Sequence, residues 1–410
     1  MSGPNTADAL RLHRLEAALD AAAPGGTKAS DADPQVADVV EVVRAPGCVN
    51  LMGDHTEDND GLILPVAIGL DTWLAYRRRR DGLVRLSFGP SSGGESSFWI
   101  DDASPDTRGR SVGRSDYVAG MAWSLREAGL PIRGLDGVVD STLPSDVGLG
   151  FSASLELVAA LALLGGARVL ERPSLAALAQ RAERDYVGAD SGIMDQYAGA
   201  AGRAGRAIML DCRSLESRYV ALPHGLSVVV CDTGSRRSGN SPLLAERRAE
   251  CGRAVALIAE RTPHVASLRD LDEAMLRRHR RILPAALARR AEHVIAENQR
   301  VLRTAIALET CDLDELGRCY ADSYRSLRTL YEVGSAAGDV MVEIALSVRG
   351  VIAARATDAG RGECTVNLVL DEAVPALQAT VAREYPGRTG LDARVYPVPV
   401  VDAAGSVATD

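Results

Sequence analysis

The stretch of this chain best suited to chemistry is a loop rich in small residues that leads into an apolar run. It covers residues 143–155 and reads LPSDVGLGFSASL. The backbone N–H groups of such a loop, with the unpaired N–H groups and positive dipole end of a following helix, can hold a phosphate. Gly148 and Gly150 permit left-handed dihedrals, and Ser152 and Ser154 offer hydroxyls to a phosphate or a magnesium ion. The loop has no Gly-Lys-Ser/Thr of a Walker motif, and a turn that only caps a buried helix has a similar composition.

A second candidate site is a turn between two apolar stretches, which carries Asp54, His55, Glu57 and Asp58. Carboxylates accept the hydroxyl protons of a sugar, and an imidazole can donate or accept. Several such groups in one place suit a polyhydroxylated ligand. The competing interpretation is a solvated polar turn, because charged residues are common on surfaces.

The third candidate is Asp195, which follows a Gly-rich turn at residues 188–192 and begins an Asp-Gln pair. A carboxylate in this position could lie beside a substrate hydroxyl. It could equally cap a helix, which aspartate does often.

Hydrophobic periodicity predicts the elements that must position these groups. Helices are expected at residues 7–23, 117–128, from the phosphate loop to about 170, 174–185, 243–261, 287–307, 313–331 and 339–348. Strands are expected at 39–43, 68–77, 83–88, 97–100, 137–141, 207–210, 226–232, 366–370 and 391–398. We place a boundary between two lobes around residues 216–225, and we expect the tail from Asp402 to be disordered.

Composition excludes several classes of function. The 410 residues contain 46% hydrophobic residues, enough for a large core. A net charge of −9 and a pI near 5.4 argue against nucleic acid or an acidic membrane as a partner. Seven scattered cysteines without a Cys-x-x-Cys pair predict reduced thiols, and six histidines form no metal spacing with them. With neither a signal peptide nor a membrane span in the sequence, we expect a cytoplasmic protein and a monomer.

Several blocks together resemble galactokinases, of the family that also holds homoserine, mevalonate and phosphomevalonate kinases (GHMP kinases). Residues 47–59 read GCVNLMGDHTEDN, similar to the galactokinase signature GRVNLIGEHTDYN. Residues 144–153 resemble the phosphate loop PxxxGLSSSA, and GIMDQ stands intact at 192–196. Further matches fall at Glu297 and Asn298, at Ser323 with 326–327, and at 331–333. The likeness runs in order from about residue 40 to 370.

The resemblance implies a two-lobed α+β fold. It consists of an N-terminal extension at 1–36, an N-terminal lobe with a mixed sheet and helices at 37–220, and a C-terminal lobe of helices on an antiparallel sheet at 221–402. It implies transfer of a phosphoryl group from ATP, with Mg2+, to the anomeric hydroxyl of a sugar. Asp195 would accept or orient the hydroxyl proton, Ser152 and, less clearly, Glu183 would bind the metal, and Asp54, His55 and Glu57 would hold the sugar. The nucleotide-binding residues would be Pro144, Gly148, Leu149, Gly150, Phe151, Ser152, Ala153 and Ser154.

Four departures from the galactokinase pattern stand out. Where galactokinases have an arginine beside the catalytic aspartate, this chain has Cys48, and a thiol cannot keep the carboxylate ionised as a cation would. Arg44 lies four residues earlier and is a candidate substitute for that arginine. Asp54 and Glu57 invert the usual Glu and Asp. Where the family has a tyrosine that contacts the sugar, this chain has Leu244. The late small-residue loop at 353–369 carries unusual charges, namely Asp358, Arg361 and Glu363.

These departures lead to three interpretations. The first is a sugar 1-kinase on a galactokinase scaffold that acts on a modified or non-galactose sugar. The second is a catalytically weak or silent protein that binds a sugar or nucleotide. The third is a GHMP kinase for a non-sugar alcohol, against which the acidic turn argues because it would repel an anionic acceptor.

Overall fold

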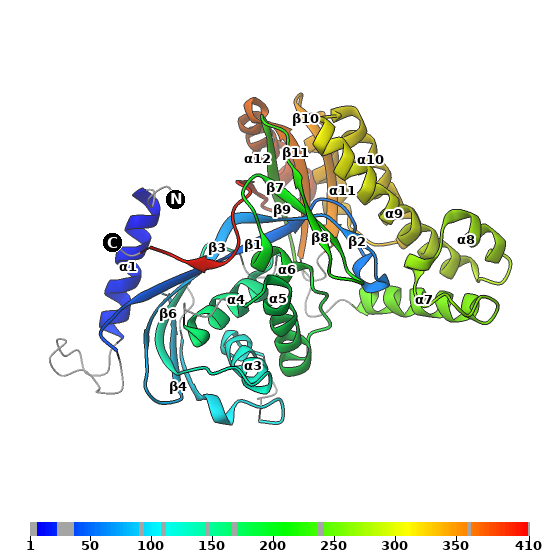
Figure 1. Cartoon of the computed structure of the whole chain (residues 1–410). Helices are drawn as coiled ribbons and strands as arrows, with labels where there is room; N and C mark the ends of the chain where they lie inside the picture. Colours follow the sequence, from blue (N-terminus) through cyan, green and yellow to red (C-terminus); the bar gives the residue numbers. More distant parts are fainter. Residues whose placement is uncertain are drawn as a thin grey trace.

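The computed structural model describes residues 6–22, 37–89, 94–107, 112–144, 147–165, 170–236, 242–358 and 362–408. Its N-terminal lobe is built on a six-stranded mixed sheet (Figure 1). The strand order is β13 (Gly405–Ser406), β1 (Glu41–Asn50), β3 (Pro65–Arg78), β6 (Leu135–Ser141), β4 (Leu83–Phe88) and β5 (Glu95–Trp99). Neighbouring strands are antiparallel except for β4 and β6, which are parallel.

The two faces of this sheet belong to different cores, because successive side chains of a strand point to opposite faces. Helices pack against the face that includes Val43 and Leu74; they are α3 (Arg114–Glu127), α4 (Phe151–Leu164), α5 (Arg172–Arg181) and α6 (Met194–Ala201). The N-terminal helix α1 (Thr6–Ala21) covers the opposite face, where Leu15 and Leu19 pack with Trp73. Strands β1, β3 and β6 are therefore buried on both sides, whereas β4 and β5 each leave one face more exposed.

The C-terminal lobe is built on a four-stranded antiparallel sheet. Its order is β10 (Val351–Asp358), β11 (Gly362–Leu370), β9 (Leu226–Arg236) and β12 (Arg394–Val398). One face packs on α11 (Ala336–Ser347) and α12 (Val374–Thr389). The other face shares a core with residues of the N-terminal lobe, so the two lobes meet through packed apolar side chains.

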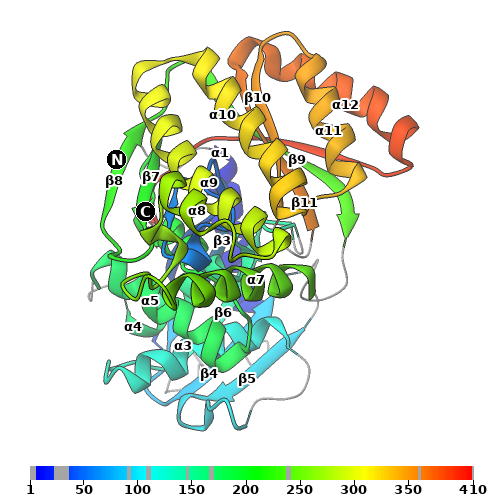
Figure 2. The same cartoon turned by 90° about the vertical axis from the view of Figure 1, so that its right-hand side faces the viewer.

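A third, smaller sheet and a group of long helices complete the molecule (Figure 2). The sheet has the order β2 (Leu62–Ile63), β7 (Arg206–Asp211) and β8 (Ser217–Ala221). The helices are α7 (Pro242–Ala259), α8 (Glu273–His279), α9 (Ala285–Thr310) and α10 (Leu313–Ser326), and the first three share a core of their own. Among the described helices, none is both long enough and apolar enough to cross a bilayer.

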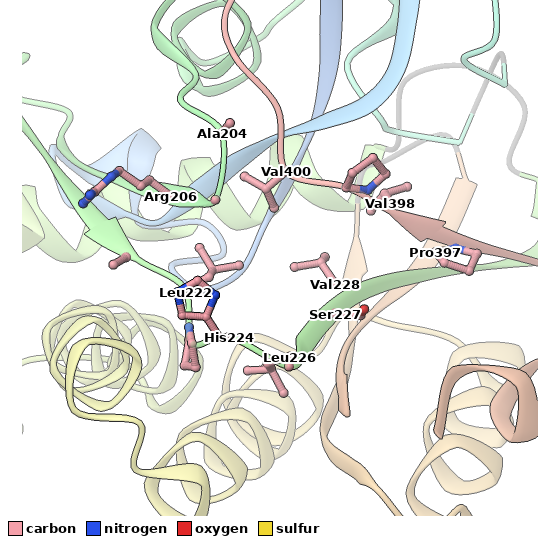
Figure 3. Close-up of a pocket in the computed structure, with 15 residues that line it drawn as sticks. Ala204, Arg206, Leu222, His224, Leu226, Ser227, Val228, Pro397, Val398 and Val400 are labelled. Carbon is pink, nitrogen blue, oxygen red and sulfur yellow. The ribbon is translucent and has the colours of Figure 1, made fainter. Parts of the chain in front are cut away.

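The chain crosses between the lobes twice, at residues 221–226 and again at 398–401. On its return it pairs with β3, where the N–H of Gly69 donates to the carbonyl of Pro399 and the N–H of Val401 donates to the carbonyl of Ala67. A cavity of about 600 Å³ lies at this double crossing. Figure 3 shows Leu222, Val228 and Val400 facing the shared space. The cavity therefore marks the hinge region between the lobes.

Most predicted elements are present, and the two-lobed α+β fold is confirmed. The main correction concerns the tail from Asp402, which is ordered in its described part, to residue 408: β13 pairs with β1, and Ala404 is buried. The prediction missed α12, whose two prolines resemble a loop signal, although Pro375 lies in the first turn, where proline is tolerated. The helix after the phosphate loop ends at Leu164, earlier than predicted. The predicted late loop at 353–369 is a correction too, because it consists mostly of the paired strands β10 and β11. Arg361 lies outside the described residues.

We expect Arg11 to anchor α1 to the sheet. Its guanidinium contacts Asp71 at 2.5 Å and Asp140 at 2.7 Å and lies 4.7 Å from the Trp73 ring centroid. Arg11→Met leaves the buried Asp71 without its nearest cation and should lower the free energy of unfolding by about 2–4 kcal/mol. Urea denaturation measures the change. Arg14→Met, on the exposed side of the same helix, is the control, and equal midpoints for both variants would contradict the anchor.

Candidate active site

The phosphate loop enters α4 through two glycines with left-handed backbones. Gly148 has φ 75°, and Gly150, the N-cap of α4, has φ 73°; a side chain is disfavoured there. The loop is fixed to β1, since the N–H of Cys48 donates to the carbonyl of Leu149 at 3.1 Å. A Cβ at Gly47 would lie 2.3 Å from the same carbonyl oxygen, so only glycine fits. The first turn of α4 therefore presents its N–H groups at a fixed place, as an anion site needs.

The two serines of this loop have different surroundings. Ser154 is fully buried, and its hydroxyl lies 2.7 Å from that of Thr72 and donates to the carbonyl of Phe151 at 2.8 Å. This corrects the expectation that Ser154 offers a hydroxyl to a phosphate, because its position in the helix turns it toward the sheet. Ser152 is partly exposed in the first turn. The other predicted nucleotide-binding residues lie around it: Pro144 and Phe151 are partly exposed, Gly148 is exposed, and Leu149, Gly150 and Ala153 are buried.

Asp195 lies directly beside the phosphate loop, in the first turn of α6. The position that a Cβ would take at Gly150 is 3.7 Å from Asp195 Cγ and 3.4 Å from Cys48 Sγ. The thiol of Cys48 donates to Asp195 Oδ1 at 2.9 Å. The structure therefore brings Asp195, Cys48 and the loop together, and their roles in a site stay a prediction.

The charge of Asp195 is poorly compensated. Burial raises its pKa to about 6; the hydrogen bond from Cys48 opposes this shift and nearby Glu183 adds to it. Burial and Asp195 raise the pKa of the Cys48 thiol, so the thiol stays protonated and acts as a donor. Arg44 does not replace the missing cation. It contacts Asp71 at 3.5 Å and the carbonyl of Asp402 at 3.3 Å.

Glu57 joins the acidic turn to the start of α6. Its Oε1 accepts from the N–H of Met194 at 2.7 Å. A Cβ at Gly192 would lie 2.0 Å from the Glu57 carboxyl carbon, so the glycine makes room for it. Burial, with Asp58 and Asp195 nearby, raises the pKa of Glu57 to about 8, although its backbone hydrogen bonds lower it. Glu57 therefore reaches the same small region as Asp195, where it can exchange hydrogen bonds with a hydroxylated ligand.

Asp54 is held by the other lobe. Its carboxylate accepts from Arg355 of β10 at 2.6 and 3.1 Å and from Asn50 at 3.1 Å. Glu297 of α9 accepts from the N–H groups of Gly53 and Asp54 at 3.2 and 3.4 Å. Burial works against its charge, yet Arg300 and other partners hold the pKa of Glu297 at about 2. The contacts of Asp54 therefore fix the conformation of the acidic turn, and a role of Asp54 in binding a sugar stays a prediction.

His55 has the free polar atom of this turn. Its backbone is left-handed, with φ 61°, and its ring stacks on Tyr331 with centroids 4.4 Å apart. The buried Nε2 has no hydrogen-bond partner in the described part of the chain. A buried polar atom without a partner is costly, and a sugar hydroxyl would satisfy it.

Leu244, on α7, is half-buried against the core of the helical group.

Two further polar residues lie near Glu183, and the sequence analysis assigned neither of them a role. Gln196 Nε2 donates to Glu183 at 2.6 Å and to Glu156 at 3.2 Å. Glu156 Oε1 and Gln196 Oε1 are buried without a partner among the described residues. The sequence could have identified Glu156, because it is a lone acid within the apolar stretch at 155–164. It could have identified Arg355 in the same way, because this residue, which is fully buried on β10, is a lone cation among small residues.

These features place the chain among the GHMP kinases. Residues 116–203 match the GHMP kinases N terminal domain. The solved mevalonate kinase of Methanococcus jannaschii shares the fold, with a TM-score of 0.63 at 16% identity over 89% of this chain and 99% of that chain.

Within this class, the chain belongs to the galactokinase family. Residues 35–78 match the galactokinase galactose-binding signature. The galactokinase of a Roseiflexus species is 39% identical over 371 residues, which cover 89% of this chain and 93% of that protein; that of Chloroflexus aggregans is 38% identical over 89% and 92%. Lactococcus lactis galactokinase, solved with galactose, has a TM-score of 0.82 at 30% identity over 90% of this chain and 95% of that chain. The chain is an ATP-dependent sugar kinase.

The raised pKa of Asp195 sets the pH dependence that we expect. A base with a pKa of about 6 is protonated below that pH, so kcat/KM should fall as pH drops through 6. Cys48→Arg stabilises the carboxylate, and the acidic limb of the pH profile, where kcat/KM falls, should move down by about 1–3 pH units. Cys48→Ala removes a hydrogen bond to the charged form and should move it up. Pre-steady-state or steady-state rates over pH 4.5–8 measure the limb, and identical limbs in all three proteins would contradict the assignment.

A second prediction concerns the pair of Arg355 and Asp54. Arg355→Met leaves a buried carboxylate unpaired and should lower the free energy of unfolding by about 3–5 kcal/mol. The double variant Arg355→Met with Asp54→Asn removes the stranded charge and should recover part of that loss. Arg349→Met, exposed just before β10, is the control. Denaturant unfolding measures all three, and a double variant no more stable than Arg355→Met would argue against an unpaired charge as the cause.

Proposed function

We propose that this chain transfers the terminal phosphoryl group of ATP to the anomeric hydroxyl of a free sugar. The observation that carries the proposal is the position of Asp195, whose Cγ is 3.7 Å from the Cβ position of Gly150 at the start of α4. A carboxylate beside the N-terminus of a helix that binds a phosphate can accept a hydrogen bond from a hydroxyl that faces the phosphate. In-line transfer mainly requires such positioning and compensation of charge.

The residues of the chain divide the work. The N–H groups of the first turn of α4 hold phosphate oxygens, with Ser152 at their edge. Asp195 Oδ2 accepts the hydroxyl proton, while the Cys48 thiol fixes Oδ1 and so sets the orientation of the carboxylate. His55 Nε2 and the Glu57 carboxyl hold other hydroxyls of the sugar.

The residues present fit a magnesium ion. Mg2+ in kinases takes one or two protein oxygens together with substrate phosphates and water, so the absence of any cluster of three ligating side chains within the described residues is compatible with it. Glu183 and the hydroxyl of Ser152 would hold the ion, and Gln196 orients Glu183 by its hydrogen bond at 2.6 Å. When bound, the ion neutralises charge on the phosphates.

We further propose that the acceptor differs from unmodified galactose. Glu57 reaches further than the aspartate of the family signature and accepts a hydrogen bond from the N–H of Met194, which leaves less of the carboxylate for a sugar hydroxyl. Leu244 supplies no hydroxyl where the family has a tyrosine. Both changes favour a sugar with a less polar or larger substituent, since unpaired polar groups discriminate strongly between substrates.

A second candidate function is binding of a sugar or nucleotide without turnover. The observation that favours it is the thiol at position 48: within the described residues, Asp195 has no arginine partner. The first candidate is better supported, because the base, the loop and the acidic turn are all in place.

A coupled assay of ADP release with ATP, Mg2+ and a panel of free sugars, including galactose and its deoxy and amino derivatives, tests the proposal. We expect turnover with at least one sugar, and Asp195→Asn should lower kcat by about 100- to 10,000-fold. Asp185→Asn, exposed near the same segment, should leave kcat unchanged. Binding of ATP without turnover of any sugar would favour the second candidate, and the highest kcat/KM with galactose itself would refute the altered acceptor.

A further inference from the structure

Arg248, on α7, joins three segments that lie around the acceptor site. Its Nε donates to Asp58 Oδ2 at 2.7 Å. Its Nη1 contacts the Asp190 carboxylate and donates to the Asp190 carbonyl at 3.1 Å. Asp58 lies in the short helical turn η2 (Glu57–Asn59), which abuts the start of α7 in Figure 1. One guanidinium therefore links a helix of the C-terminal lobe to two loops of the N-terminal lobe.

The two loops are those that carry the chemistry. Asp58 directly follows Glu57, and Asp190 lies within the Gly-rich turn at residues 188–192 that leads to Asp195. On the inner side, Glu57 already bonds to the N–H of Met194 at 2.7 Å. Arg248 joins the same two loops on the outer side and ties both to α7.

The neighbouring arginine shows that α7 is attached to the site by a second contact. Arg247 is buried, and its Nε donates to the carbonyl of Tyr331 at 2.7 Å. The ring of Tyr331 stacks on His55. A movement of α7 would therefore reach both His55 and the loops of Glu57 and Asp195.

One member of the charge pair departs from the galactokinase signature. Asp58 stands where the galactokinase signature has a tyrosine, so an ionic contact replaces an aromatic side chain. Side-chain exposure is 29% for Arg248, 24% for Asp58 and 70% for Asp190. Partly exposed pairs of this kind are weak individually and are screened by salt. Such contacts can form and break during turnover, which a buried pair such as that of Arg355 cannot do easily.

We propose that Arg248 is a positioning residue that latches α7 over the acceptor site and holds Glu57 and Asp195 in register with a bound sugar. The inference rests on the proposed sugar kinase function. An open latch admits the sugar between the lobes, and a closed latch restores the contacts to Asp58 and Asp190.

Steady-state kinetics of Arg248→Met test the latch. We expect KM for the sugar to rise about 3- to 10-fold, as for the loss of two partly exposed ion pairs, with KM for ATP unchanged and kcat changed less. Wild-type KM for the sugar should rise with ionic strength between about 0.05 and 0.5 M, whereas that of the variant should not. Arg277→Met, which breaks the exposed pair with Glu273 on α8, is the matched control.

A double-variant cycle separates the latch from a general loss of structure. Asp58→Asn should raise KM for the sugar by itself, and adding it to Arg248→Met should raise KM no further, because the pair is already broken. Additive effects, or a sugar KM in Arg248→Met equal to that of the Arg277→Met control, would overturn the proposal.

Hydrogen exchange gives a readout that does not depend on turnover. Residues 54–60 and 188–194 should both exchange several-fold faster in Arg248→Met than in wild type, while Arg277→Met should match wild type at both segments. Faster exchange without turnover of any sugar by the wild type would reject the proposed kinase function and retain the latch. Unchanged exchange at both segments, in a protein that phosphorylates a sugar, would reject the latch alone.

Discussion

The buried pair of Arg355 and Asp54 is the interaction on which the site depends. A fully buried guanidinium requires an anion and several acceptors, and Arg355 finds them in Asp54 and in the carbonyls of Asn50 and Leu51, at 2.9 and 3.2 Å. All three belong to the N-terminal lobe, whereas Arg355 belongs to β10 of the C-terminal lobe. The turn that carries His55 and Glu57 is therefore fixed to both lobes at once. The position of the acidic turn relative to the C-terminal lobe follows from this constraint.

Because the turn is fixed by residues outside the centre of the site, the residue at position 48 can change while the fold stays the same. At position 48 a thiol replaces the arginine of the galactokinase signature and still donates to Asp195 at 2.9 Å. The hydrogen bond keeps the carboxylate oriented, but a neutral donor stabilises its charge less than a cation does. Burial raises the pKa of Asp195 to about 6, and the hydrogen bond from Cys48 opposes only part of that shift. The proposed base therefore has a pKa near neutral pH instead of far below it. A base nearer to the working pH is a stronger proton acceptor, so part of the lost electrostatic help is offset.

The sequence predicted what depends on local pattern and missed what depends on distant partners. The glycines at 148 and 150 predicted a loop that opens a helix, and α4 begins at Phe151. The inward direction of Ser154 follows from the register of that helix against β3, where Thr72 meets it, and neither could be read from the loop alone. Asp54 and Arg355 are 301 residues apart in sequence, so no local pattern pairs them. The tail after Asp402 lacks apolar alternation, yet β13 is ordered because β1 offers it a free edge.

The distribution of charge also decides which acceptor the site can take. Glu57, Asp58, Asp195 and Glu183 bring four carboxyl groups to a small region, and the pKa values of Glu57 and Asp195 rise because burial and the neighbouring acids disfavour their charged forms. The compensating positive groups lie at two places, the helix N-termini of α4 and α6 inside and Arg248 outside. Within the described residues, the phosphate loop is therefore better suited to an anion, whereas the acidic turn is better suited to a neutral, hydroxyl-rich molecule. An anionic alcohol of the mevalonate type would meet repulsion where a sugar meets acceptors for its hydroxyl protons.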